Sequence, residues 1–427
     1  MEVKYISSAC LQIKTSDACI LTDPWFTQGV YDGAWFSMRD IDPFDYIEEP
    51  DFIYVSHIHP DHYDPNFIKK IFNKFGKKKI LIPDFEKNYL LIKGKSDGLE
   101  LTPLRDLHIG NTSFYIEEND MGSLSDIDSA LIIHDKKTNK TMLNLNDCVP
   151  HEPHLKKLKS IISNLKTELD LLALGYTGAG PFPQTYFDPD QERDILISKA
   201  EEKKKRGFKR YSYYDNFFNA QYNLPFAGEY LLGGNNIHLN QYRGVADAYE
   251  VTSFDEKAIV FNPGGKINLE CGSKTNLRDH IYSKSFIDDR LNVIQAAKMD
   301  YEKDFSMAPE KINFSRLMNL AAVNAQQKSE INSSYYFVFS ITSKDLVLYR
   351  YLLSCDTGEI KLIDYDQKIN FEQYSEIFTD YRLMFGLLTG FYHWNNADIG
   401  SAYQTRRFPT DNFQMNVQGY LNFFTAA

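Results

Sequence analysis

Cysteine is scarce in this chain, with five residues among 427. These cysteines are scattered at Cys10, Cys19, Cys148, Cys271 and Cys355, which excludes the disulfide framework of a small secreted domain. Long apolar runs are also missing, because no segment approaches the roughly 20 residues that a membrane-spanning helix needs. The first residues, Met1 to Lys4, lead directly into a strand-like segment and not into the apolar core of a signal peptide. We therefore expect a cytoplasmic protein that does not contact a membrane.

Basic charge is in deficit as well. The chain has 47 lysines and arginines against 58 aspartates and glutamates, for a net charge of −11. Nucleic acid is thereby excluded as the main partner, because binding to phosphates needs a basic surface. One basic-looking stretch, residues 201–206, is expected to be a solvated helix face. The length and the 43% hydrophobic content suit one large or two ordinary domains.

A dense cluster of metal-binding side chains stands out against this background. The apolar run Phe52–Val55 predicts a buried strand, and His57, His59, Asp61 and His62 follow it within a few residues. Two histidines separated by one residue can turn toward one cation, while the aspartate and the last histidine reach a second. Imidazole binds zinc, iron and copper, and an added carboxylate favours harder ions. This segment therefore predicts a site for two metal ions.

The His-x-His-x-Asp-His arrangement resembles the signature of the metallo-β-lactamase superfamily. That resemblance implies an αββα sandwich whose metals lie at the ends of strands, with an aspartate that bridges them after a later strand. Asp147, after the apolar segment that ends at Leu145, supplies this residue and is our candidate catalytic group. Residues 9–14 and 18–26 read as the two antiparallel strands expected near the start, ending at the turn that contains Asp23.

A narrower resemblance extends along nearly the whole chain. Short motifs occur in the same order as in the CMP-N-acetylneuraminate hydroxylase family: Asp23-Pro24-Trp25, Asn146-Asp147-Cys148, Gly178-Ala179-Gly180, Pro225-Phe226-Ala227-Gly228, Ile399-Gly400 and Gln404-Thr405-Arg406. One departure is large. That family carries a Rieske iron–sulfur domain, which needs paired Cys-x-His and Cys-x-x-His ligands, and none of the five cysteines here is so placed.

The remaining metal ligands are less obvious. Hydrolases of the superfamily usually place a third histidine at the end of a strand where this chain has Glu117 and Glu118, so we expect one of these carboxylates to be the ligand; using His108 or His134 would require a shifted topology. His238 is the expected last ligand. His151 and His154 are the alternatives to it.

A ligand set with two or three carboxylates favours iron over zinc, because oxygen ligands stabilise ferric iron. Glutamate in place of the third histidine also resembles the diiron hydroxylases of this fold. We therefore expect two metal ions per chain, with iron favoured over zinc or manganese. The expected enzyme is an oxygenase that uses dioxygen and an external electron donor, for which a separate protein is a candidate. The alternatives are a zinc hydrolase acting on a phosphoester, lactone or amide, and a metal-binding protein without catalysis.

Candidate substrate groups come from two segments. The late segment gathers aromatic, amide and guanidinium groups in Trp394, Asn396 and Arg406, which suit a carboxylate or a phosphate. The glycine-rich residues 175–180 let backbone amides approach an anion closely, although an ordinary strand-to-helix turn explains them almost as well. If the family resemblance extends to the ligand, the substrate is an acidic or nucleotide-linked small molecule.

The organisation along the chain agrees with this fold. Residues 1–260 alternate strands and helices and are expected to form the metal domain. Residues 261–427 are expected to form a mostly helical α+β region that covers the site. We expect that region to contain a hairpin of residues 335–341 with 346–353, and a helix over residues 371–390.

Overall fold

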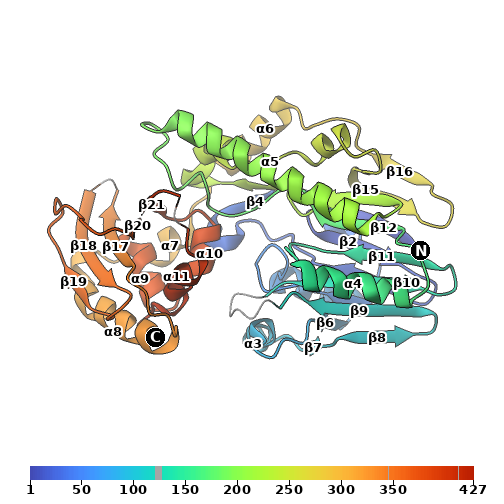
Figure 1. Cartoon of the computed structure of the whole chain (residues 1–427), viewed down its shortest axis with the longest axis horizontal. Helices are drawn as coiled ribbons and strands as arrows, with labels where there is room; N and C mark the ends of the chain where they lie inside the picture. The colour runs from blue at the N-terminus through green and yellow to red at the C-terminus, as the bar shows by residue number, and fades with distance from the viewer. Residues whose placement is uncertain (121–126, 345, 412) are drawn as a thin grey trace.

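The computed structural model describes residues 1–120, 127–344, 346–411 and 413–427. Figure 1 shows two lobes. The larger lobe contains both long sheets and the N-terminus, and the smaller lobe contains the last part of the chain. The mixed α/β class expected from the sequence is confirmed.

The first long sheet has eight strands in the described part of the chain, in the order β16-β15-β1-β2-β3-β5-β6-β7. Strands β1, β2 and β3 are antiparallel, as expected, whereas β3, β5, β6 and β7 run parallel. The bounds are β1 Glu2–Ser7, β2 Cys10–Lys14, β3 Cys19–Thr22, β5 Phe52–Tyr54, β6 Lys79–Ile82, β7 Leu101–Pro103, β15 Phe261–Asn268 and β16 Lys274–Leu277.

The second long sheet has the order β13-β12-β11-β10-β9-β8 among the described residues. It contains an antiparallel hairpin, in which Ile132 of β10 lies opposite Leu143 of β11. Strand β10 is buried along its whole length, because both faces of the sheet are covered. The bounds are β8 Asp106–Ile109, β9 Thr112–Glu118, β10 Ser129–Asp135, β11 Lys140–Asn144, β12 Leu171–Gly175 and β13 Tyr222–Phe226.

Helices cover the outer face of each sheet and complete the expected αββα sandwich. Helix α2, Pro65–Phe75, packs on the first sheet through Phe67 and Ile71, and α3, Tyr89–Ser96, lies beside it. Helices α4, Glu152–Asn164, and α5, Arg193–Phe218, cover the second sheet (Figure 1). Among the described residues, no helix combines the length and the apolar character needed to cross a membrane.

The inner faces of the two sheets form a shared apolar core. Residues such as Ile20, Phe114 and Leu131 are fully buried there. Two dissimilar sheets packed face to face bring strand ends from both to one edge of the sandwich, which is where the metal-binding motif lies.

The first sheet continues past residue 260, where we expected the metal domain to end. Val3 of β1 lies opposite Ile267 of β15, and β15 in turn pairs with β16. Residues up to Leu277 therefore belong to the sandwich. The expectation failed because a sequence shows the alternation of a strand but not its partner, and here the partner is the first strand of the chain.

The C-terminal lobe contains a sheet in the order β19-β18-β17-β20-β21 among the described residues. The expected hairpin is confirmed as β17 and β18. The expected helix over residues 371–390 is wrong in its first half: residues 374–380 alternate in burial and form β20, parallel to β17. The bounds are β17 Tyr336–Ser343, β18 Leu346–Ser354, β19 Ile360–Leu362, β20 Tyr374–Asp380 and β21 Gln404–Phe408.

Helices complete this lobe. The carboxylate of Asp380 accepts a hydrogen bond from the backbone N–H of Arg382 and so starts α9 where the strand ends. The helices of this lobe are α7 Asp300–Asp304, α8 Phe314–Lys328, α9 Tyr381–Leu388, α10 Trp394–Ile399 and α11 Met415–Gly419. Helix α6, Lys284–Ile294, lies near α5 on the larger lobe (Figure 1). The 3₁₀ helices in the described parts of both lobes are η1 Pro43–Asp45, η2 Gly234–Tyr242, η3 Ala248–Ser253, η4 Pro309–Lys311 and η5 Tyr420–Phe423.

One apolar core joins the two lobes. It runs from Trp35 of β4, Trp35–Ser37, and Tyr230 of β14, Tyr230–Leu232, to the buried helices of the C-terminal lobe. The Trp35 and Tyr230 rings stack with centroids 3.6 Å apart. Helix α1, Val30–Gly33, contacts α10, and a Cβ on Gly400 would lie 3.1 Å from Tyr31 Cβ. This close packing holds α10 against the metal-binding edge of the sandwich.

We expect Trp394→Ala to lower the free energy of unfolding by about 3–5 kcal/mol, because it removes a large buried side chain from this core. Trp394 is 2% exposed, and its indole N–H donates to the Phe424 carbonyl over 2.8 Å. Denaturant unfolding measures the change. The control Tyr365→Ala removes an aromatic ring that is 78% exposed and should cost less than about 1 kcal/mol. Equal effects of the two substitutions would contradict the core role of Trp394.

Candidate metal centre

The proposed ligands come from the ends of two strands in different sheets. The loop after β5 carries His57, His59, Asp61 and His62, and Asp147 follows β11. The backbone N–H of Ser56 donates to the buried carboxylate of Asp23 over 2.7 Å, which fixes the start of the loop. Because the carboxyl ends of β5 and β11 meet at one edge of the sandwich, the loops after them face each other.

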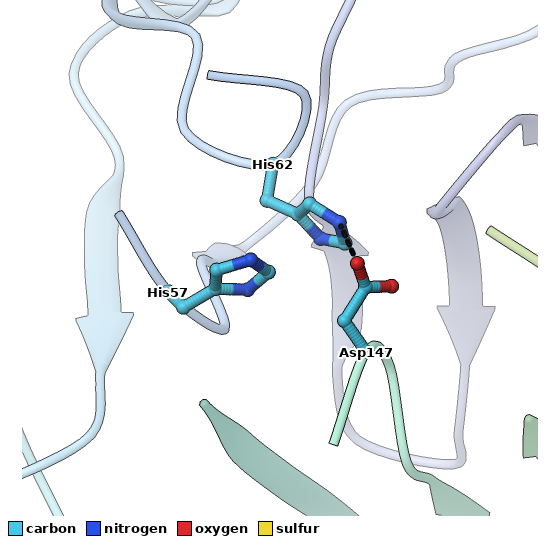
Figure 2. Close-up of side chains that lie close together, drawn as sticks. All are labelled: His57, His62 and Asp147. Atoms are coloured by element: carbon cyan, nitrogen blue, oxygen red, sulfur yellow. Dashed lines mark ion pairs between the residues drawn. The ribbon is translucent and has the colours of Figure 1, made fainter. Parts of the chain in front are cut away.

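The side chains of His57, His62 and Asp147 point toward one another (Figure 2). One ligand atom from each lies within 4.8 Å of the others. His62 Nε2 is 3.5 Å from Asp147 Oδ2 and 3.7 Å from Asp61 Oδ2. His57 Nε2 is 2.9 Å from His59 Nδ1. The structure therefore brings all five residues of the predicted motif into one cluster.

These distances fit bound metal ions. Nitrogen and oxygen ligands about 2 Å from one cation lie roughly 3 to 3.5 Å from each other. The nitrogen and oxygen separations in the cluster fall in or near this range. Imidazole and carboxylate are also the donor groups that zinc and iron accept. The residues present thus fit a two-metal site of the kind that the sequence predicts.

Burial makes the cluster electrostatically demanding. Burial, together with the neighbouring His62, lowers the pKa of His57 well below its usual value. Burial also opposes the charge on His62, but the carboxylates of Asp147 and Asp61 outweigh it and raise the pKa of His62 well above its usual value. Burial alone would raise the pKa of Asp147, yet the neighbouring histidines lower it. A bound cation would hold the carboxylates ionised and the imidazoles neutral, which is how both bind metals.

Polar groups behind the cluster orient its members. Ser56 Oγ lies 2.9 Å from His57 Nδ1 and 3.3 Å from His62 Nδ1, and Asp23 Oδ2 lies 3.2 Å from the same His62 nitrogen. These contacts leave the Nε2 atoms of both histidines facing the cluster. The Tyr31 hydroxyl donates to Asp61 Oδ1 over 2.6 Å. Such partners fix the tautomer and the direction of a metal ligand.

The C-terminal lobe adds one contact of this kind through a residue that we did not anticipate. The Asn395 side-chain oxygen on α10 lies 3.2 Å from His59 Nε2. Because that oxygen can only accept, His59 carries its proton on Nε2 and presents the lone pair of Nδ1 toward His57. Asn395 thereby selects the tautomer of His59 that can bind a metal inside the cluster.

The structure does not bring Glu117 or Glu118 to the cluster. Glu117 forms an ion pair with Lys157 on α4, and Glu118 lies 3.8 Å from Arg105. Burial raises the pKa of Glu118. Glu117 and Glu118 are the last two residues of β9, and their side chains face Lys157 and Arg105. The sequence alone does not show which neighbours the side chains at the end of a strand will face.

A different carboxylate lies near the position that we expected a glutamate to fill. Asp128 Oδ1 is 3.7 Å from His57 Nε2, and Asp128 lines the same cavity as Asp147. The residue precedes β10, and its carbonyl accepts from the backbone N–H of Asn119 over 2.9 Å, so it sits opposite the end of β9. An aspartate directly before a buried strand was the available sequence signal. Residues 121–126, between the two strands, lie outside the described part of the chain.

None of the other expected histidines joins the cluster. His238 is exposed on η2, with Nδ1 2.9 Å from the Asn235 carbonyl oxygen. The segment after β14 curls into this 3₁₀ helix and so turns the histidine to solvent. His154 is buried in α4 against the second sheet, where burial lowers its pKa to about 4. Its ring lies 6.4 Å from that of His151.

The expected substrate residues do not line the cavity beside the cluster. Trp394 is buried in the core of the C-terminal lobe, and Asn396 is half-buried on α10. Arg406 Nη1 donates to the Thr185 carbonyl over 3.3 Å. On α10 it is Asn395, and not Asn396, that contacts His59. On β21 the pairing with β20 places Arg406 opposite Glu376, and its guanidinium contacts Thr185 and not the cluster.

A cavity of about 270 Å³ opens beside the cluster. Its lining includes Tyr31, Asp147, Ile399 and Arg210, together with Gly175 and residues 177–180 of the glycine-rich segment. The volume is just below the roughly 300–1,000 Å³ of typical ligand pockets. It accepts a small molecule or the reacting part of a larger one.

We expect Asn395→Ala to weaken metal binding roughly ten- to hundredfold, because His59 loses the partner that fixes its tautomer. Competition with a chromophoric chelator measures the affinity. Asn396→Ala is the matched control, since its side chain is the next amide on the same helix and does not line the cavity. If both variants bind metal as tightly as the wild-type protein, Asn395 does not orient His59.

The part of the chain that holds this site is similar to known proteins. Residues 2–178 match the profile described as the beta-lactamase superfamily domain. A Mycobacterium tuberculosis protein named as a Rieske 2Fe-2S iron-sulfur protein is 28% identical over 243 residues, which cover 53% of this chain and 44% of that protein. The cytidine monophosphate-N-acetylneuraminic acid hydroxylase of Xenopus laevis is 26% identical over 243 residues, which cover 54% of this chain and 38% of that enzyme. The chain thus spans less than half the length of these relatives.

Solved structures are also similar over part of the chain. An isothiocyanate hydrolase from Delia radicum gut bacteria has 17% identity and a TM-score of 0.39, over 63% of this chain and 99% of its own. A diiron β-hydroxylase from Streptomyces venezuelae has 13% identity and a TM-score of 0.38, over 60% of this chain and 52% of its own. The family profile spans every residue of the cluster from His57 to Asp147. Residues 2–178 are thus similar to the beta-lactamase superfamily domain, in agreement with the resemblance seen in the sequence.

Proposed function

We propose that this protein is a dinuclear metal enzyme that uses iron to oxidise an acidic small molecule. The observation that carries the proposal is the balance of donors in the cluster. Three imidazoles, of His57, His59 and His62, lie beside three carboxylates, of Asp61, Asp128 and Asp147. A set in which half of the donor groups are carboxylates suits iron better than the nitrogen-rich sets of hydrolytic zinc sites.

The distances suggest how the donors would divide between two ions. His57 and His59 lie together, with Asp128 beside His57, and would hold one ion. Asp61 lies beside His62, and both would hold the other. Asp147 would bridge the two ions. The ion held by Asp61 and His62 would have fewer protein ligands than the other ion. Open positions would therefore remain there for reactants, as in catalytic metal sites.

The chain's own residues would position and protect the reacting groups. Two iron ions would supply the activation of dioxygen that no side chain can provide. Tyr31 holds Asp61 through its hydroxyl, and Ser56 holds the two histidines behind it. Ile399 brings an apolar side chain of the C-terminal lobe to the cavity wall, which limits the entry of water.

Similarity to the hydroxylase supports the oxidative reaction, although it covers 38% of that enzyme. The 427 residues contain no Rieske ligand pattern, so electrons would come from a donor outside them. A small electron-donor protein is the partner that we propose, in addition to the small-molecule substrate.

A zinc hydrolase is the second candidate, and the histidine-rich motif itself favours it. Zinc would lower the pKa of a bound water toward neutrality. Asp147, at the cavity wall beside His62, would then orient that water toward a phosphoester, lactone or amide.

Metal content separates the two candidates. Protein produced in medium with equal iron and zinc is expected to contain two irons per chain and to show ferric charge-transfer absorption. When reduced chemically, it should consume dioxygen faster than protein loaded with zinc. Two zinc ions per chain and no oxygen consumption would instead support the hydrolase. Elemental analysis measures the metal content per chain, and an oxygen electrode measures the rate of dioxygen consumption.

Asp128→Asn tests the carboxylate that favours iron. Removing this charge should lower the ratio of bound iron to bound zinc several-fold, because a carboxylate prefers the harder ion. Glu118→Gln is the matched control, since it removes the same charge from a residue 3.8 Å from Arg105 and outside the cavity. A change of metal ratio in the control but not in Asp128→Asn would return the ligand role to the glutamate.

A further inference from the structure

Helix α5 brings a cation to the metal-binding cavity. Lys203, Gly207, Arg210 and Tyr214 recur at helical spacing and therefore share one face of α5. That face packs on the glycine-rich loop after β12. A Cβ on Gly207 would lie 2.8 Å from the Tyr176 carbonyl oxygen, so glycine allows this close approach. The packing places the guanidinium of Arg210 at the wall of the cavity.

The Arg210 side chain has hydrogen-bonding capacity left for a ligand. Its Nη2 donates to the Thr177 carbonyl over 3.1 Å, which anchors it to the loop. Within the described part of the chain, no ion pair is formed by Arg210 at 4.0 Å or less. A guanidinium has five N–H donors, so most of them remain available. Among the described residues that line the cavity, Arg210 is the one lysine or arginine.

The loop beside Arg210 offers further donors. Residues 177–180 line the cavity, and in the described structure their backbone N–H groups are not donors in any hydrogen bond. Adjacent amides that face a cavity form a concave site for an oxyanion. Arg210 and residues 177–180 line one cavity together with Asp147 and two more residues of the cluster, His59 and Asp61.

The charges around the cavity call for such a group. The chain carries a net charge of −11, and Asp61, Asp128 and Asp147 all line the cavity. These carboxylates repel an anion unless cations offset them. Arg210 lines the same cavity as these carboxylates and supplies one such cation.

We propose that Arg210 and the amides of residues 177–180 form a subsite for the carboxylate or phosphate group of the substrate. This inference rests on the proposed function, because the subsite holds the substrate while another part of it reaches the metals. A guanidinium binds either oxyanion through two parallel hydrogen bonds. The subsite takes the role that the sequence suggested for Arg406.

Calorimetric titration of the metal-loaded protein with inorganic phosphate and with acetate, at one ionic strength, tests the subsite. Arg210→Gln should weaken anion binding roughly ten- to hundredfold, because a charge-assisted pair of hydrogen bonds is lost. Arg210→Lys should lose less, because it keeps the charge without the fork. The matched control Arg206→Gln removes the same charge from an exposed site one turn earlier on α5 and should stay within about twofold.

Metal content and thermal stability are measured on every variant and should equal those of the wild-type protein. Tighter binding of phosphate assigns the subsite to a phosphate group, and tighter binding of acetate assigns it to a carboxylate. If Arg210→Gln binds both anions as the wild-type protein does, the metals alone hold them and the subsite is refuted. A wild-type protein that takes up no metal contradicts the proposed function instead, and the same four proteins still decide the role of Arg210.

Discussion

The meeting of buried ionisable side chains at one edge of the sandwich is the constraint on which the rest of this structure depends. His57, His62 and Asp147 lie within a few ångströms of each other; the two histidines are almost fully buried, and Asp147 is half-buried at the cavity. Burying charge without compensation is costly, so this arrangement requires cations or a fixed set of hydrogen bonds. Asp23 and Ser56 supply part of that compensation from behind, and bound metals would supply the rest from within.

The C-terminal lobe also contacts this cluster and the cavity beside it. Its core is continuous with that of the sandwich through Trp35 and Tyr230, so α10 is held firmly. From there Asn395 reaches His59, and Ile399 reaches the cavity wall. A minimal sandwich would leave this edge open to water. The lobe thus links the packing of a distant core to the orientation of one proposed ligand.

The sequence predicted the site residues whose positions follow from motif spacing. It did not predict those whose side-chain direction depends on tertiary packing. The histidine motif and Asp147 were predictable, because each directly follows an apolar strand. The sequence does not determine which way the side chains of Glu118 and Arg406 face, so the roles expected of them could not be placed from it. Asp128 lies near the position expected for Glu118, and Arg210 is the residue proposed for the role expected of Arg406. Each is brought to the cavity by packing between elements that are distant in the chain. For the same reason β15, which pairs with the first strand, was assigned to the wrong lobe.

Anomalous diffraction from crystals of the protein, collected at the iron and zinc absorption edges, tests the central claim most directly. The account predicts two peaks per chain, both within bonding distance of Asp147, one beside His57 and His59 and the other beside Asp61 and His62. Iron should dominate both peaks. A single peak, or two peaks that Asp147 does not contact, would contradict the account.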